Sequence, residues 1–434
     1  MSSSPRGTSA SRRERLPPRL LPLLYFGFGH LTLASAFLLL ALTPGTLAGF
    51  FYQPRMLAVV HLITLGWISC SILGGIYMIA PMALRMRLPA SRLDYLAYAL
   101  VTAGIVAMVG HFWIDSYSGM VWGAGTLLLG LLCVSLRVLG SLRSAKLPPA
   151  VKLHIALAFL NILMAGTVGL LLGLEKQLIH VLPGYILTNV AAHAHLAALG
   201  WATMMVMGTG YRLLPMFLPA APPEGASVYA SAALLEIGTV GVFICLMMRT
   251  VWLRLSALLV VAGLVAFFLH VYWMKQHPRP SPKGLTRPDY GMLQAQQALL
   301  YLALSAALGL ALPWIPAGEW KLRLVVVYGV FGLVGFLSQM VVGMSARLMP
   351  IFAWMHGYVG SDFAVLPPSP HAMPARRLQA VTLCLWSAGV PLLATGFFFD
   401  LPLVLAAGAW GLLAAVIIEA INSVLVVRHG FSAP

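Results

Sequence analysis

The chain has 434 residues, of which 60% are hydrophobic and only 9% are charged. A soluble domain carries about 25% charged residues, so this composition excludes an ordinary soluble enzyme or binding domain. Apolar runs of roughly 20 residues recur along the chain, and each is long enough to cross a bilayer as a helix. Lipid offers the backbone no hydrogen-bond partners, so we expect such runs to span as helices. The composition therefore predicts an all-α, polytopic membrane protein.

We expect about twelve transmembrane helices and no soluble domain. Residues 1–19 are expected to form a basic cytoplasmic tail, and residues 20–434 a single transmembrane domain. The first apolar segment follows an Arg-rich start, but it is too long for the apolar region of a signal peptide, so we expect it to be retained. The expected spans are 20–43, 56–84, 93–115, 118–140, 150–174, 187–218, 229–248, 253–274, 291–313, 322–350, 378–398 and 402–427.

The net charge of +16 reflects an excess of Lys and Arg over Asp and Glu. These basic residues are distributed unevenly along the chain, which indicates membrane topology rather than nucleic-acid binding. If the N-terminus is cytoplasmic and the spans alternate, 21 of the 27 Lys and Arg residues fall on the cytoplasmic side. This asymmetry is that of the positive-inside rule. It predicts a multi-pass protein of the inner or plasma membrane with both termini cytoplasmic, in contact with the lipid bilayer and not with nucleic acid.

One helix motif, His-Leu-x-x-Leu-Gly-Trp, occurs twice. Residues 61–84 and 195–218 are identical at ten of 24 positions at a constant offset of 134, from His61/His195 and Trp67/Trp201 to their final leucines. Apolar composition alone would align some Leu and Gly residues, but not His, Trp, Tyr and Pro together without a gap. The Trp and Tyr side chains have polar tips that need hydrogen-bond partners at depth, and the proline 20 residues after each histidine is expected to end the span.

A weaker third copy lies 135 residues further on, in residues 335–352, where Val330 takes the place of His195. The three copies fall in spans 2, 6 and 10, four spans apart. They predict three parallel four-helix units with pseudo-threefold symmetry, at about 20–140, 150–274 and 291–427.

The histidines near the outer face are the candidate functional residues. His61, His193, His195 and His111 are expected in the outer third of the bilayer, where an ionisable residue is a functional hypothesis by default. Imidazole binds iron, copper and zinc, and two histidines at one depth on equivalent helices, such as His61 and His195, can hold one haem iron from opposite faces. The alternative is a hydrogen-bonded structural role, which we expect for His30, His154 and His270.

His193 and His195 are two residues apart, so their rings are about 200° apart around the helix. They are poorly placed to chelate one metal, and well placed to serve two sites flanking the same helix. Glu236 and Glu419 are the carboxylates expected deep in the membrane, either as proton relays or as helix–helix hydrogen-bond partners.

Twelve spans in three parallel units, with His61 on span 2 and the stretch HAHLAALGW on span 6, resemble subunit I of the haem-copper oxidase superfamily. The closest resemblance is to its short, divergent members related to cbb-type oxidases and nitric oxide reductases. In that family the span 2 histidine is an axial ligand of a haem, a position that His61 matches. The span 6 histidine is a copper ligand, in the region of His193 and His195.

The chain lacks some of the histidines that the family has. The family's adjacent histidine pair is missing, because residues 229–248 contain no histidine, and Tyr328 and Val330 stand where it has His-x-His on span 10. The resemblance implies a haem scaffold with His61, His195 and His193 as cofactor-binding residues. It also implies copper as a second metal, at His193 or His111, and an electron-donor subunit or cytochrome as partner. The implied function is electron transfer or oxygen or nitric oxide chemistry by an oxidoreductase. The alternative is a metal- or haem-handling or transport protein that keeps the scaffold without redox turnover.

Overall fold

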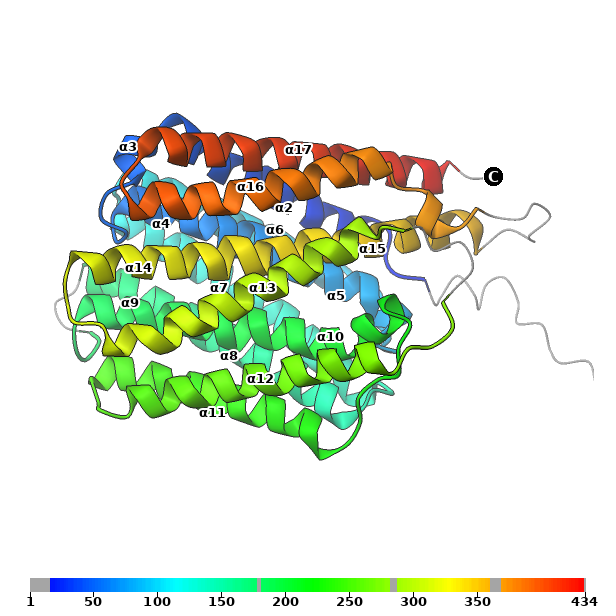
Figure 1. Ribbon diagram of the computed structural model, residues 1–434, viewed down its shortest axis with the longest axis horizontal. Helices are drawn as coiled ribbons and strands as arrows, with labels where there is room; N and C mark the ends of the chain where they lie inside the picture. Colours follow the sequence, from blue (N-terminus) through cyan, green and yellow to red (C-terminus); the bar gives the residue numbers. More distant parts are fainter. Residues whose placement is uncertain (1–15, 178–180, 282–286, 360–367, 433–434) are drawn as a thin grey trace, which may run out of the picture.

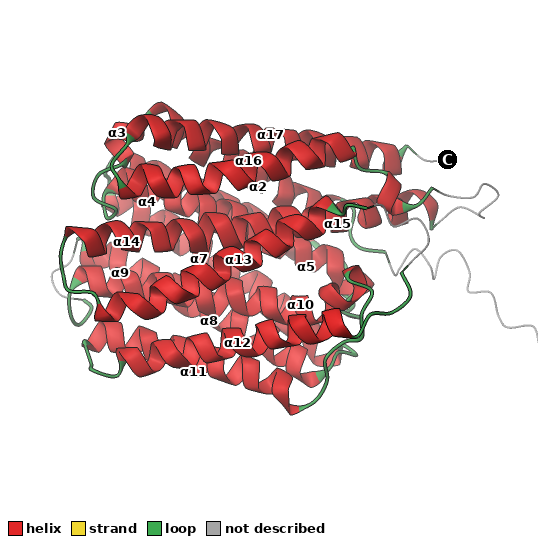
Figure 2. Ribbon diagram, in the orientation of Figure 1, coloured by secondary structure: helices red, strands yellow, loops and turns green. Residues whose placement is uncertain are grey.

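The computed structural model describes residues 16–177, 181–281, 287–359 and 368–432, and every regular element in these ranges is a helix (Figure 2). Most of the expected basic tail, residues 1–15, lies outside the described residues. Within the described ranges, twelve helices are long and apolar enough to cross a membrane. They lie side by side in one bundle (Figure 1). The expected all-α architecture and number of spans are confirmed.

The spans are numbered here in chain order. Each begins and ends within four residues of its expected position except span 10, which ends eight residues later than expected. Spans 1 to 4 are α2 (Leu20–Leu42), then α4 (Pro54–His61), η1 (Leu62–Ser69) and α5 (Cys70–Met82), then α6 (Arg92–Trp113), and α7 (Tyr117–Ser144). Spans 5 to 8 are α8 (Pro149–Glu175), then α9 (Ile186–His195), η2 (Leu196–Thr203) and α10 (Met204–Phe217), then α11 (Ala226–Met248), and α12 (Leu253–Gln276). Spans 9 to 12 are α13 (Tyr290–Ala311) with η3 (Leu312–Trp314), then α14 (Glu319–Gly329), η4 (Val330–Ser338) and α15 (Gln339–Tyr358), then α16 (Arg376–Phe398), and α17 (Pro402–Phe431). Two short helices, α3 (Pro44–Leu47) and η5 (Pro370–Ala372), lie between spans.

Successive spans alternate in direction, so the loops gather at two ends of the bundle. We call the end that holds residues 83–91, 145–148 and 218–225 the basic end; it lies at the right of Figure 1, with the C-terminus. The opposite end holds residues 43–53, 114–116 and 249–252.

The expectation that a proline ends each motif-bearing span is wrong for span 10. Pro81, Pro215 and Pro350 all lie inside their helices. The first two helices end within two residues of the proline, whereas span 10 continues to Tyr358. Proline removes one backbone hydrogen bond, and a helix can continue past it where neighbouring packing holds the backbone.

Spans 2, 6 and 10 each contain a π-helical segment where their sequences align. The segments Leu62–Ser69 and Leu196–Thr203 begin directly after His61 and His195, and Val330–Ser338 begins at the valine that replaces the histidine. A π-helix has i→i+5 hydrogen bonds, one residue longer than those of an α-helix, and is frequently found at functional sites. The three-unit repeat itself remains a prediction from the sequence.

Two buried indole groups join the π-helical segments to one another. Trp201 Nε1 donates to Ser69 Oγ at 3.0 Å, which connects span 6 to span 2. Trp67 Nε1 donates to the carbonyl of Ser338 at 3.4 Å, which connects span 2 to span 10. Both indoles are almost fully buried, so an unpaired N–H would carry a desolvation cost. The expected need of these tryptophans for polar partners is confirmed.

Glycines bring the helices of the outer hairpins into backbone contact. In the α6–α7 hairpin, a Cβ at Gly104 would lie 2.5 Å from the backbone nitrogen of Leu127. A Cβ at Gly123 would lie 2.6 Å from the backbone nitrogen of Met108. Small residues permit such close approach in membrane helices, and here they fix the wall of the cavity described below.

We predict that Gly104→Ala lowers the stability of the purified protein by about 1–3 kcal/mol, because the new methyl group must push α6 away from the α7 backbone. Gly110→Ala, on the same helix, is the matched control because nothing lies within 4 Å of its Cβ position. Thermal unfolding in detergent measures both variants. Equal unfolding temperatures for the two would contradict the close packing of this hairpin.

Candidate functional site

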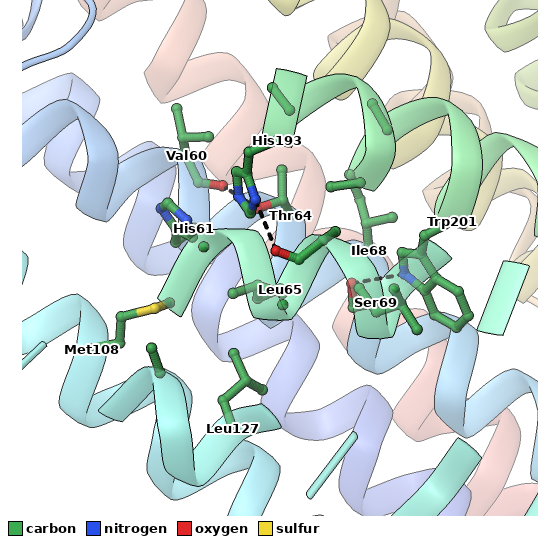
Figure 3. Close-up of a pocket in the computed structure, with 18 of the residues that line it drawn as sticks. Val60, His61, Thr64, Leu65, Ile68, Ser69, Met108, Leu127, His193 and Trp201 are labelled. Atoms are coloured by element: carbon green, nitrogen blue, oxygen red, sulfur yellow. Dashed lines mark hydrogen bonds between the residues drawn. The ribbon is translucent and has the colours of Figure 1, made fainter. Parts of the chain in front are cut away.

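A cavity lies between spans 2, 3, 4, 5, 6 and 10. Its volume is about 170 Å³, and most of its wall is apolar. Figure 3 shows that His61 and His193 point into it from two helices, while the Trp201–Ser69 hydrogen bond lies further along its wall. The principal apolar lining residues are Leu57, Leu65, Met108, Met120, Leu127 and Ile162.

The two histidines at this cavity are each anchored by one ring nitrogen. His61 Nδ1 lies 2.7 Å from the carbonyl of Leu57 on its own helix, and His193 Nδ1 lies 2.9 Å from the carbonyl of Ala165 on span 5. A carbonyl only accepts, so each Nδ1 carries the proton and each Nε2 keeps its lone pair. Within the described residues neither Nε2 has a hydrogen-bond partner. A backbone carbonyl on one nitrogen is the usual arrangement of a metal-binding histidine, because it fixes tautomer and ring orientation.

The surroundings of the two rings leave them little freedom. The Phe112 ring stacks on His61 with centroids 5.2 Å apart and planes at 27°. On span 5, a Cβ at Gly169 would lie 2.9 Å from His193 Cε1, so a glycine is needed for the ring to fit. Neither of these neighbours stood out in the sequence as part of a site.

His195 lies on another face of span 6 and does not line this cavity. Its Nδ1 is 2.7 Å from the carbonyl of Ala191, and its Nε2 is 3.2 Å from the hydroxyl of Tyr328 on span 10. The two rings are stacked, with centroids 5.9 Å apart. The structure therefore brings His61 together with His193 and not with His195. The two rings of the His-x-His sequence point to different neighbours, as their 200° separation predicts.

Corresponding positions explain why the neighbouring interfaces differ. At the sequence offsets of 134 and 135, His193 corresponds to Val59 and Tyr328, and His195 corresponds to His61 and Val330. The interface of spans 2 and 6 thus has two histidines and an open cavity. At the interface of spans 6 and 10, the Nε2 of His195 is satisfied by Tyr328. In the third pair, spans 10 and 2, valines hold both positions. Tyr328 was identified in the sequence as the residue in place of a family histidine, but its contact with His195 required the tertiary structure.

His111 does not line the cavity. Its ring packs against Gly119 on α7, where a Cβ would lie 2.0 Å from His111 Cε1, and its Nδ1 is buried without a hydrogen-bond partner. The structure therefore does not bring His111 to His193. Within the described ranges, no group of three or more His, Cys, Asp or Glu side chains could hold a metal ion.

The two carboxylates expected deep in the membrane form hydrogen bonds between helices. Glu419 pairs with His30, and its other oxygen accepts from Ser345 at 3.0 Å. Glu236 accepts from Asn161 Nδ2 at 2.8 Å. For these carboxylates the structure provides helix–helix partners.

The histidines that we expect to be structural also have partners. His154 Nε2 lies 3.2 Å from Ser231 Oγ, and His270 Nδ1 lies 2.8 Å from the hydroxyl of Tyr211. His30 has Glu419. The expectation of hydrogen-bonded roles for these three histidines is confirmed.

A second, smaller cavity of about 60 Å³ extends from the two histidines toward the end opposite the basic end. Its outer rim holds Lys176, whose ammonium lies 4.8 Å from the ring centroid of Tyr52 and 5.2 Å from that of Tyr117. Burial raises the pKa of Tyr52 to about 12, with the nearby Tyr117 adding to the shift, so its phenol stays protonated. The histidine pair therefore lies between an apolar interior and a cationic rim.

Comparison with known proteins assigns no family: no family model matches the chain, and no curated protein matches it. Any function proposed for the cavity therefore rests on the residues of this chain.

We predict that His195 and Tyr328 are energetically coupled. Tyr328→Phe removes the hydroxyl that satisfies His195 Nε2 and should lower stability by about 0.5–1.5 kcal/mol. In a His195→Ala background the same change should cost much less. Thermal unfolding of the two single variants and the double variant gives the coupling energy. Full additivity would contradict the hydrogen bond.

Proposed function

We propose that this integral membrane protein binds haem in the cavity between spans 2 and 6, with His61 and His193 as the axial ligands. The observation that carries the proposal is the pair of imidazoles on one apolar cavity. Each is anchored through Nδ1, and neither Nε2 has a hydrogen-bond partner among the described residues. The resemblance to haem-copper oxidase subunit I supports the same cofactor. Because His195 Nε2 bonds Tyr328, His193 takes the ligand role that the repeated motif suggested for His195.

The donor set fits a haem iron, because two neutral imidazoles are common axial ligands and the apolar walls suit the faces of a porphyrin. The cavities of about 170 and 60 Å³ are smaller than the roughly 300–1,000 Å³ of most cofactor pockets. Haem entry therefore requires lining side chains to rotate outward. Met108 and Met120 are suited to this, because the unbranched methionine side chain adapts to irregular spaces.

A haem held by His61 and His193 would supply one-electron transfer or oxygen or nitric oxide chemistry. The protein's own contribution is to hold both ligand nitrogens in one tautomer and to exclude water with an apolar wall. Lys176 at the outer rim is placed to neutralise an acidic group of a bound cofactor or a charge on a partner protein. Copper is not carried into the proposal, because His111 does not share the cavity.

A metal-handling protein without haem is the second candidate. The observation that favours it is the open volume of about 170 Å³, which admits a metal ion or a small molecule without rearrangement. This candidate predicts bound metal and no haem absorption.

We predict that purified protein from a haem-replete host shows a Soret band and a pyridine-haemochrome signal. His61→Gly and His193→Gly should each abolish the low-spin spectrum, and added imidazole should restore it by filling the vacated ligand position. His195→Ala is the matched control and should leave the spectrum unchanged. Colourless protein, or loss of the spectrum in His195→Ala alone, would refute the assignment. Metal analysis of colourless protein would test the second candidate.

We also propose that the protein lies in the inner or plasma membrane with both termini cytoplasmic, on the basis of the excess of Lys and Arg at the basic end. The exposed residues Ser227, at the basic end, and Ala317, at the opposite end, provide matched cysteine positions.

A membrane-impermeant maleimide should label the Ala317→Cys variant in intact cells. It should label Ser227→Cys only after permeabilisation, because the basic end faces inward. The reverse pattern would invert the proposed orientation.

A further inference from the structure

A second site lies far from the histidine cavity, in a groove at the basic end beside α6 and α7. The groove has a volume of about 450 Å³. Its polar part is formed by Arg87, Arg137, Ser141 and Ser144, and its apolar part includes Leu93 and Leu136. It shares no lining residue with the histidine cavity, so its role does not depend on the proposed haem.

Arg137 is held in place by contacts that leave part of it free. Its Nε donates to Asp94 Oδ1 at 3.2 Å, and its Nη2 donates to the carbonyl of Pro89 at 3.0 Å. The Arg137 side chain is still 31% exposed, and its Nη1 has no hydrogen-bond partner within the described residues. A guanidinium fixed on one side and open on the other is preorganised for an anion.

The groove carries a net positive charge, because one of its two arginines has no acidic partner among the described residues. Asp94 neutralises Arg137, but Arg87 is exposed and has no acidic partner in the described part of the chain. Ser141 lies one turn beyond Arg137 on α7, and its hydroxyl is free to donate to an anion. Arginines and hydroxyl groups together are the usual donors to a phosphate.

The apolar part of the groove favours a phospholipid over a free phosphate ion as the ligand. Leu136 is 65% exposed and Leu93 is 45% exposed, on the bundle surface directly beside the two arginines. In a membrane these side chains face acyl chains. An ion from solution would gain nothing from them, whereas a phospholipid fills both parts at once.

We propose that this groove binds the headgroup of an anionic phospholipid. Arg87 and Arg137 contact the phosphate, Ser141 donates a hydrogen bond, and an acyl chain lies along Leu93 and Leu136. Basic pockets at the ends of membrane helices bind anionic headgroups in this way. The net positive charge selects an anionic lipid over a zwitterionic one, because a choline group would meet Arg87 with like charge.

The test uses purified full-length protein, delipidated in detergent and titrated with phosphatidylglycerol, phosphatidylcholine or inorganic phosphate. Native mass spectrometry counts the bound lipids. Wild-type protein should retain phosphatidylglycerol in preference to phosphatidylcholine, and Arg87→Gln should weaken that binding roughly tenfold through loss of a charged hydrogen bond. Arg143→Gln is the matched control, because Arg143 is exposed on α7 at the same end of the bundle but does not line the groove.

A second variant, Leu136→Asn, tests the apolar part and should weaken lipid binding without loss of a charge. Arg137 is left intact because it holds Asp94. The proposal is overturned if Arg87→Gln and Arg143→Gln lose lipid equally, which would indicate general surface attraction. It is also overturned if phosphatidylcholine binds as well as phosphatidylglycerol, or if inorganic phosphate at equal concentration displaces the lipid.

Discussion

The hydrogen bonds of two buried tryptophans, Trp67 and Trp201, set the geometry on which the rest of the structure depends. An indole N–H in an apolar interior needs an acceptor, and each finds it on a neighbouring span, at Ser338 and Ser69. These bonds fix the rotation of spans 2, 6 and 10 about their own axes. His61 and His195 lie six residues before the two tryptophans on the same spans, so the rotation also decides which way the histidines point.

The repeated histidine-bearing helix makes different contacts in span 2 and in span 6. On span 6, His193 faces the open cavity with His61, while His195 is satisfied by Tyr328. A tyrosine hydroxyl is enough to turn a ligand position into a structural contact, because it occupies the nitrogen that a metal would use. The cavity that we propose for haem is thus distinguished by two histidines whose Nε2 atoms have no hydrogen-bond partner in the part of the chain that the structure describes.

The two carboxylates deep in the membrane are already paired. Glu419 bonds His30, and Glu236 bonds Asn161, so these carboxylates connect helices. An unpaired charge in lipid is costly, and pairing within the protein is the usual remedy. Against this background the Nε2 atoms of His61 and His193 and the open side of Arg137 stand out, because they line a cavity or groove and have no hydrogen-bond partner in the described residues.

The sequence predicted much of the fold, because a membrane span can be recognised from the local run of apolar residues that forms it. All twelve spans could be placed within several residues, with the largest error at span 10, where a proline was taken as an end and the helix continues to Tyr358. The repeated motif singled out His61 and His195, whereas the structure places His61 and His193 on one cavity. The π-helical segments were not predicted, because their wider turn depends on packing between spans rather than on a periodic pattern.

The sequence by itself determined the all-α class and the number of candidate membrane spans, and it predicted that His61, His193 and His195 lie at one depth. It also predicted that His193 and His195 point apart, since helix geometry follows from spacing alone. Only the tertiary structure decided that His61 faces His193 and that Tyr328 satisfies His195. The physical reason is that helices in lipid pack by shape and by a few hydrogen bonds, so apolar composition does not reveal which helix lies against which face.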